Sequence, residues 1–336
     1  DISGNNPVGL AITDLDIALN SSSAVAFDLN GATLSAPIII GDFDVTNAGA
    51  AGTSIAVDLR GTLGGASILL GGQSGASSSI AGVGTGIALN ASTNALVTYG
   101  DGESASDIAS TISASIAIDA TNAPTSGTYD FRDVAFAGSP GAGFGVNKIW
   151  FVDADGAIGG GNGSGSDGNN PMTIAAAAAV AGIQDIIVLV NNGSAISTGA
   201  SALALVTGAQ VRGFGDGIGG GAGSGSAPIA LTITVPPTIL LSGGSTINLA
   251  DPTGLGAATL TASAGAPSVV TLAASGNRLS GFILDGVGGV GRGIFDGGAG
   301  TANAQLDRLT IRNFVGIGGV IIADLNSSTI DNVAFS

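Results

Sequence analysis

Short stretches in which apolar residues alternate with small polar ones recur through the first 146 residues. Four of them read AVAFDLNG from Ala24, SIAVDLRG from Ser54, GIALNAST from Gly86 and SIAIDATN from Ser115. Each is followed by a polar turn and a second apolar stretch, the first of which begins APIII at Ala36. The alternation with a period of two, together with the β-branched residues, predicts strands rather than helices.

These stretches return at a nearly constant interval. Alignment on Val25, Ile55, Ile87 and Ile116 gives spacings of 30, 32 and 29 residues. Such a period is typical of solenoids and repeat arrays. We therefore expect an all-β fold, a parallel β-helix with one or more coils per repeat. Inward-facing Ile, Val, Leu and Ala would stack on their equivalents one coil away, while Gly, Asn, Asp and Ser would turn the corners.

One segment departs from the strand pattern. Five consecutive alanines, the strongest helix formers, follow shortly after Pro171. Asn170 suits the N-cap, proline suits the first helical position, and Gly182 suits the helix end. The pattern predicts a helix over 171–181. Because an open β-helix end exposes strand edges and an apolar core, we interpret this helix as the N-terminal cap of a second β-helix. An ordinary amphipathic surface helix is the alternative.

The chain is expected to divide at the start of this second pattern. Residues 1–146 hold the degenerate repeats of about 30 residues, and residues 147–336 form a second β-helix that begins with the strand KIWFVDAD. A glycine-rich loop over 156–169 separates that strand from the helix. The chain starts without methionine and stops within the strand-like DNVAFS, so we expect it to be a piece of a longer protein.

The second segment carries a recognisable order of motifs. A strand ends in Val152-Asp153, a Gly/Ser/Asp/Asn loop follows, and Asn170-Pro171, Thr173-Ile174 and Ala177 open the helix. Later stretches read LSGFILDG over 279–286 and LTIRNF over 309–314. In these features residues 148–336 resemble the bacterial pectate-lyase-like, right-handed parallel β-helix proteins. The resemblance implies a right-handed coil and a secreted, cell-surface setting. Before residue 148 the similarity, to repeats of very large bacterial surface proteins, is compositional.

Charge and missing residue types narrow the function. The 336 residues include 24 acidic and 8 basic side chains, for a net charge of −16. Such a polyanion is a poor partner for nucleic acid and is repelled by anionic membrane surfaces. There is no cysteine and no histidine, which excludes disulfides, thiolate metal sites and histidine-based catalysis. The longest apolar run, 173–190, is interrupted by Gly182, Gln184 and Asp185, so no membrane insertion is expected.

Acidic residues around the glycine-rich loop form the candidate metal site. Asp153, Asp155 and Asp167 bring hard oxygen ligands to one loop, which is the chemistry that Ca²⁺ prefers. The loop lacks the glutamate of an EF-hand, and its aspartate does not fit the calcium-binding nonapeptide repeat. The alternative is a solvated loop in which these side chains cap turns. Apart from this possible Ca²⁺, no cofactor is expected.

Paired acids and two arginines are the candidates for carbohydrate chemistry. The pairs Asp14/Asp16 and Asp42/Asp44 would share a strand face, either as carboxylate pairs for glycoside hydrolysis or as outward solubilising rows; a third pair is Asp130/Asp133. Arg308 and Arg312 could share a face with room for an acidic sugar, or each could pair with an aspartate of a neighbouring coil.

Together these features favour a non-catalytic structural or adhesive segment of a large secreted bacterial surface protein, such as a filament, surface layer or adhesin stalk. Self-association into a fibre, sheet or rod is the expected partnership. Two alternatives are a glycan-binding module and a polysaccharide lyase or hydrolase. A glycan-binding module would need exposed aromatic side chains, for which Trp150, Tyr99 and Tyr129 are the only tryptophan and tyrosines.

Overall fold

The chain folds into parallel β-structure with a single short helix among the residues that the structure describes. This computed structural model describes all residues except 1–4, 7–8, 50–51, 72–76, 102–109, 137–148, 157–164, 166–167, 169–170, 217–224, 233–234, 242–243, 245, 273–274, 288, 298–300, 315–317 and 323–324. The predicted all-β, parallel character is confirmed. Contacts divide the chain into two units: residues 1–146 with 230–250, and residues 147–229 with 251–336.

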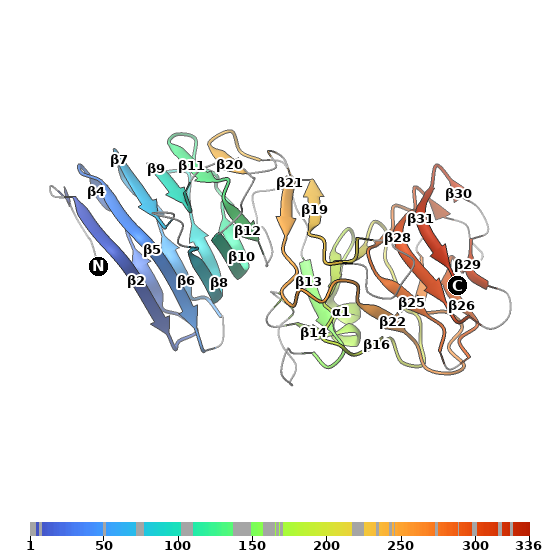
Figure 1. Cartoon of the computed structure of the whole chain (residues 1–336). Coiled ribbons are helices and arrows are strands. Elements are labelled where there is room, and N and C mark those ends of the chain that lie inside the picture. Colours follow the sequence, from blue (N-terminus) through green and yellow to red (C-terminus); the bar gives the residue numbers. More distant parts are fainter. Residues whose placement is uncertain are drawn as a thin grey trace. The chain divides into compact units, whose positions relative to one another are not determined.

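The first unit is one 15-stranded sheet. Its strands are β1 (Asn5–Asn6), β2 (Leu10–Leu19), β3 (Val25–Asp28), β4 (Thr33–Leu34), β5 (Ile38–Asn47), β6 (Ile55–Asp58), β7 (Leu63–Leu70), β8 (Ser79–Ala88), β9 (Asn94–Tyr99), β10 (Ser110–Asp119), β11 (Thr128–Phe131), β12 (Val134–Phe136), β19 (Ile229–Thr232), β20 (Ile239–Leu241) and β21 (Thr246–Leu249). Figure 1 shows β2, β5, β8 and β10 side by side in chain order. The strand β5 pairs in parallel with β7 through its first half and with β8 through its second half.

The repeats stack in register, with one correction to the alignment. Val25 pairs with Ile55 as aligned, but Ile55 pairs with Thr85, and Thr85 pairs with Ile116. The alignment of Ile87 with Ile55 was therefore wrong by two residues. A slip of two keeps every side chain on its original face of the sheet, so alternation of apolar and polar residues cannot detect it.

The core of the first unit includes a column of register partners two residues further along each of these strands. Phe27, Val57, Ile87 and Ile118 are in register on β3, β6, β8 and β10, and all four are buried. Each apolar side chain therefore packs against its equivalent about one strand spacing away, near 4.8 Å. The core is not purely aliphatic, because the ring of Phe27 packs edge-on against that of Phe43, with ring centroids 5.9 Å apart.

The second unit contains three parallel sheets, of 10, 4 and 2 strands. Its elements are β13 (Ile149–Asp153), β14 (Met172–Thr173), α1 (Ile174–Val180), β15 (Ile186–Leu189), β16 (Ile196–Ser197), β17 (Leu203–Ala204), β18 (Gln210–Gly213), β22 (Thr259–Thr261), β23 (Val270–Thr271), β24 (Arg278–Ser280), β25 (Ile283–Asp285), β26 (Arg292–Phe295), β27 (Thr301–Ala302), β28 (Gln305–Arg312), β29 (Gly318–Ile321), β30 (Leu325–Asn326) and β31 (Thr329–Phe335). Its core column runs through Ile187, Val211, Leu279 and Leu306, which are in register and buried.

The helix α1 is shorter than predicted. It begins at Ile174, and Thr173 is its N-cap, with the threonine hydroxyl accepting the N–H of Ala176 at 3.3 Å. The predicted start at Pro171 was wrong because Met172 and Thr173 form β14 and pair with β13. Burial of the Met172 side chain in the core outweighs helix propensity there. No helix among the described residues is long and apolar enough to span a membrane.

Residues 230–250 belong to the first unit although they lie between two parts of the second. The strand β20 extends the sheet beyond β11 in parallel, pairing Ile239 with Tyr129. The strand β21 does the same beside β12, pairing Leu249 with Phe136. The sequence pattern indicates a single division, between residues 146 and 147, and does not predict this return.

Candidate functional site

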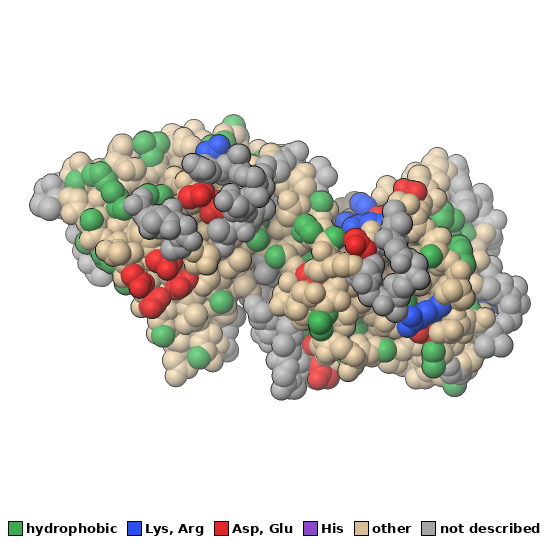
Figure 2. Space-filling model, in the orientation of Figure 1, with side chains coloured by type: hydrophobic (Ala, Val, Ile, Leu, Met, Phe, Trp, Pro, Cys, Tyr) green, Lys and Arg blue, Asp and Glu red, His purple; other side chains and the backbone are tan. Residues whose placement is uncertain are grey.

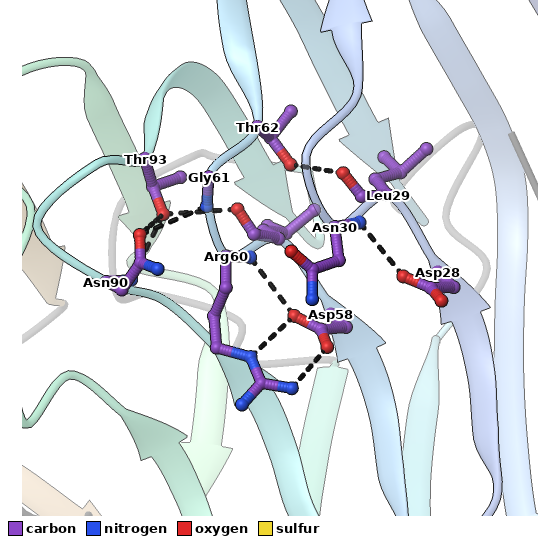
Figure 3. Close-up of polar contacts among 10 residues, drawn as sticks. Asp28, Leu29, Asn30, Asp58, Arg60, Gly61, Thr62, Asn90 and Thr93 are labelled. Atoms are coloured by element: carbon purple, nitrogen blue, oxygen red, sulfur yellow. Dashed lines mark hydrogen bonds and ion pairs between the residues drawn. The ribbon is translucent and has the colours of Figure 1, made fainter. Parts of the chain in front are cut away.

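A repeated turn closes the strands β3, β6 and β8 of the first unit (Figure 3). In the first two turns an aspartate accepts the backbone N–H two residues later: Asp28 from Asn30 at 2.9 Å, and Asp58 from Arg60 at 3.1 Å. An aspartate in this position competes well with regular backbone pairing and favours a turn. The repeated Asp-Leu-Asn and Asp-Leu-Arg sequences thus end each strand at the same point.

Threonine hydroxyls connect successive turns. Thr62 donates from Oγ1 to the carbonyl of Leu29 at 2.8 Å, and Thr93 donates to the carbonyl of Leu59 at 3.1 Å. Both threonines are fully buried. In each case the acceptor lies more than 30 residues earlier in the chain, in the turn of the neighbouring repeat. The hydroxyl therefore fixes the position of one turn relative to the next.

The third turn replaces a backbone acceptor with a side chain. Gly31 donates its N–H to the carbonyl of Arg60 at 3.0 Å. One repeat later, Gly61 donates instead to the Oδ1 atom of Asn90, also at 3.0 Å. The same Asn90 oxygen accepts the N–H of Ser92. The contact between turns therefore continues although the sequence in register changes from DLRG to ALNA.

Two of the arginines pair with an aspartate in their own turn. Arg60 contacts Asp58 at 2.5 Å and Arg132 contacts Asp130 at 2.6 Å, each through Nη2. The hydrogen bond that Arg60 donates to Asp58 raises the pKa of Arg60, against the opposing effect of burial. The two carboxylates of the Asp130/Asp133 pair therefore have different partners. Asp130 binds Arg132, whereas Asp133 accepts a hydrogen bond from the hydroxyl of Ser110 at 3.2 Å. These contacts are structural ion pairs and hydrogen bonds.

The other two acid pairs lie together on the outer face of β2 and β5. Asp14 is in register with Asp42, and Asp16 with Asp44. Figure 2 shows acidic side chains gathered on the face of the first unit. Repulsion from Asp14, followed by desolvation and by Asp44 and Asp42, raises the pKa of Asp16. We name this group of four carboxylates the acidic row.

Two of the candidate calcium ligands, Asp153 and Asp155, accept hydrogen bonds from the side chain of Asn192. Asp153 is buried, and its Oδ1 atom accepts the N–H of Gly156 at 2.5 Å. The amide nitrogen of Asn192 donates to both Asp153 and Asp155 at 3.3 Å. The Oδ1 atom of Asn192 accepts the N–H of Ser194, which turns the amide nitrogen rather than its oxygen toward the carboxylates.

Burial is the main cause of the raised pKa of Asp153, because it disfavours the charged form of the carboxyl group. Asp167 lies outside the described residues. Within the described part of the chain, no three acidic side chains are grouped so that they could hold a metal ion. Calcium binding remains a prediction.

The two candidate arginines on β28 each contact a carboxylate. Arg312 binds Asp285, its register partner on the neighbouring strand β25, at 2.7 Å. Arg308 contacts Asp307, the residue before it, at 3.3 Å. Burial would raise the pKa of Asp285, but hydrogen bonds from Asn313 and Arg312 outweigh it and lower the pKa.

The three aromatic candidates for sugar stacking are not exposed platforms. Tyr99 and Tyr129 are fully buried. The indole of Trp150 is partly buried and donates from Nε1 to Asp185 at 3.0 Å. Sugar binding by aromatic stacking, which requires an accessible ring face, therefore finds no support at these residues.

A cluster of arginines that sequence reasoning missed lies on β18, β24 and β28. Arg278 donates from Nε and Nη2 to both oxygens of Asp307, at 3.1 and 3.3 Å. Arg308 donates from Nη2 to the hydroxyl of Ser280 at 2.9 Å. Arg212, which is 2% exposed, is the third member. We name these three side chains the arginine cluster.

The electrostatics of this cluster are unusual for so acidic a chain. Burial lowers the pKa of Arg212 to about 10, and the neighbouring charges of Arg278 and Arg308 act in the same direction, while Asp307 opposes them. Burial would raise the pKa of Asp307, but hydrogen bonds from Arg278 and Ser280 lower it overall. The only signal in the sequence was the polar spacing Gln-x-Arg, Arg-x-Ser and Gln-x-Asp in three strands far apart in the chain.

Comparison with known proteins leaves the chain without an assigned family. No protein-family model, no curated protein and no solved structure matches it.

Proposed function

We propose that the chain is a non-catalytic structural segment of right-handed parallel β-helix type, from a large secreted surface protein. The observation that carries the proposal is the continuous stacking of equivalent turns in the first unit. Buried Thr62 and Thr93 each hydrogen-bond the previous turn, and the strands between the turns pair in parallel. In this proposal α1 covers the core at the start of the second coil stack, because Ile174 and Ala177 lie in that core beside β13 and β14.

A structural role also suits the side-chain chemistry. Candidate side chains for hydrolysis or lysis are used in ion pairs, as at Asp130–Arg132 and Asp285–Arg312, and the acidic row lies on the outer face of β2 and β5. Stacked repeats draw their stability from contacts between neighbouring repeats, which suits an extended structural element. We therefore infer an extracellular rod that associates with further copies of itself, without nucleic acid or membrane insertion.

Electron microscopy of the full chain at neutral pH tests this proposal. We expect regular fibres or sheets. Exposed apolar side chains on β31, such as those of Ile330 and Phe335, are the expected contact between copies. The variant Ile330→Lys, at a position 48% exposed on β31, should shorten the fibres.

The variant Val287→Lys, at a position that is 61% exposed but outside any strand, is the matched control and should leave the fibres unchanged. Dispersed single particles of the unaltered chain at all concentrations would count against the proposal.

A further inference from the structure

Two strands of the first unit, β11 and β12, pair with a segment that comes from much later in the chain. The strand β20 follows β11 over three residues, beginning where Ile239 pairs with Tyr129, and Figure 1 shows the two strands side by side. The strand β21 joins β12 where Leu249 pairs with Phe136. We name residues 230–250 the returning segment, and β11 and β12 the receiving strands.

Backbone hydrogen bonds and buried apolar side chains hold the returning segment. Tyr129 donates its N–H to the carbonyl of Thr238, and Ala250 donates its N–H to the carbonyl of Phe136, each at 2.9 Å. The hydroxyl of Thr238 donates to the carbonyl of Pro124, also at 2.9 Å. The buried apolar side chains on β20 and β21 are those of Ile239, Leu241 and Leu249. Any copy of the chain carries the same groups, so these contacts do not select the copy that supplies the segment.

The returning segment is tied to the second unit at both ends. Residue 229 before it and residue 251 after it both belong to the second unit. The receiving strands are therefore linked, through the segment, to whichever second unit supplies it. When the segment comes from another copy, the same strand pairing joins two copies of the chain.

The pairing of the returning segment is short compared with the pairing inside the sheet. Among the described residues, β20 shares three register pairs with β11 and β21 shares one with β12, whereas β2 and β5 share nine. The free energy of local opening is smallest where few buried contacts and backbone bonds are lost. The segment can therefore leave the receiving strands while the rest of the sheet stays folded.

We propose that the returning segment is exchanged between copies, so that residues 230–250 of one copy pair with the receiving strands of another. Exchange of an identical element is a low-cost route to oligomers, because the same contacts form in both arrangements. Pairing within one copy competes through its high effective concentration, so exchange belongs to concentrated chains. The inference rests on the self-association proposed above, and it adds a contact surface and a partner, a second copy of this chain.

The chain has no cysteine, so introduced cysteines can report which copy supplies the segment. Asp130 and Leu240 are register partners on β11 and β20, and adjacent strands lie about 4.8 Å apart, within reach of a disulfide. Full-length Asp130→Cys and Leu240→Cys chains are mixed in urea, refolded together at high concentration and oxidised. We expect a disulfide-linked dimer that joins position 130 of one chain to position 240 of the other, identified by mass spectrometry of its peptides.

Two controls accompany this experiment. The variant Val287→Cys, at an exposed position outside any strand, replaces Leu240→Cys in a parallel mixture and should give about tenfold less mixed dimer, because no pairing raises its effective concentration. The double variant Asp130→Cys/Leu240→Cys, refolded in dilute solution, should close an internal disulfide, which shows that the strands keep their register. A second pair, Thr128→Cys and Thr238→Cys, lies one position earlier on the same strands and should repeat the result without altering Asp130.

The outcomes separate this inference from the proposed function. A mixed dimer at the level of the Val287→Cys control, with the internal disulfide intact in the double variant, would overturn strand exchange. Fibres seen by electron microscopy in that same sample would leave the proposed function standing. A dominant link between positions 130 and 240 of different chains, in a sample without fibres, would support strand exchange and count against the fibre.

Discussion

At the scale of single residues, short polar side chains decide how one repeat meets the next. Asp28 and Asp58 end their strands by accepting a backbone N–H, and Thr62 then reaches the turn below. Where the repeat loses its Asp-Leu-Arg pattern, Asn90 supplies the missing acceptor. The turns of the first unit therefore help to set the register between repeats.

The variant Thr62→Val tests the hydroxyl contact between turns. Valine keeps the shape of the buried side chain but removes the donor to the Leu29 carbonyl. We expect a loss of about 1–2 kcal/mol in the free energy of unfolding, measured by urea denaturation. The variant Thr62→Ser, which retains the hydroxyl, should recover most of that loss. An unchanged urea midpoint in Thr62→Val would show that the contact contributes nothing.

The acidic row makes a prediction about pH. The pKa of Asp16 is raised by the charge of Asp14, by desolvation, and by Asp44 and Asp42. A carboxyl whose pKa is higher in the folded chain than in the unfolded chain lowers stability as pH rises through that interval. We expect Asp16→Asn to raise the melting temperature at pH 7, and the gain to disappear as the pH falls below the unfolded pKa of aspartate, near 4.

Salt provides the control for this prediction. At about 1 M NaCl the Debye length is near 3 Å, so repulsion between exposed carboxylates is largely screened. The stabilisation by Asp16→Asn should therefore shrink at high salt. A gain that is the same at low and high salt would mean that the effect is not electrostatic.

At the scale of elements, the sequence pattern predicted that a helix exists but not where it begins. The alanines predicted a helix, and one is present, but its start moved from Pro171 to Ile174. The strand β14 takes the intervening residues because Met172 has a place in the core, a tertiary fact that local propensity does not contain. Likewise the stacking of equivalent strands followed from the repeat, whereas the two-residue shift at Thr85 did not.

The two faces of α1 give a matched test of its packing. Ala177 is fully buried in the core, whereas Ala178 is exposed. We expect Ala177→Leu to destabilise the second unit by about 1–3 kcal/mol, because the extra methylenes overpack a closed site. The variant Ala178→Leu should change stability by less than about 0.5 kcal/mol. Thermal unfolding monitored through the fluorescence of Trp150 would measure both, and equal effects would place α1 away from the core.

Of the candidate sites, the sequence indicated one arginine pair but not the arginine cluster. A pair between Arg312 and an aspartate of a neighbouring coil was foreseen as one of two alternatives, without identifying Asp285 as the partner. The arginine cluster was not, because Arg212 and Arg278 lie far apart in the chain and meet only through the register of β18 with β24. Pairings between distant strands are not encoded in any local pattern.

At the scale of the whole molecule, the return of residues 230–250 to the first unit can be tested on β20. Ile239 is 3% exposed and Leu240 is 37% exposed on the same strand. Ile239→Ala should cost about 2–5 kcal/mol and Leu240→Ala much less. Hydrogen exchange should then accelerate at the amides of β11 in the first variant, while those of β18 remain protected.

Faster exchange in β18 and unchanged exchange in β11 would contradict the assignment of residues 230–250 to the first unit. The sequence could not predict that assignment, because β20 resembles the strands around it in composition and only its pairing with β11 distinguishes it.

The same return sets an order of events during synthesis. The sheet of the first unit is complete only when β20 and β21 join β11 and β12. The ribosome must add about 100 further residues after β12 before this can happen, which takes about 5–20 s at typical elongation rates. For that time the nascent chain presents open strand edges to its neighbours. Until the late strands emerge, these edges are sites at which two nascent chains can pair with each other.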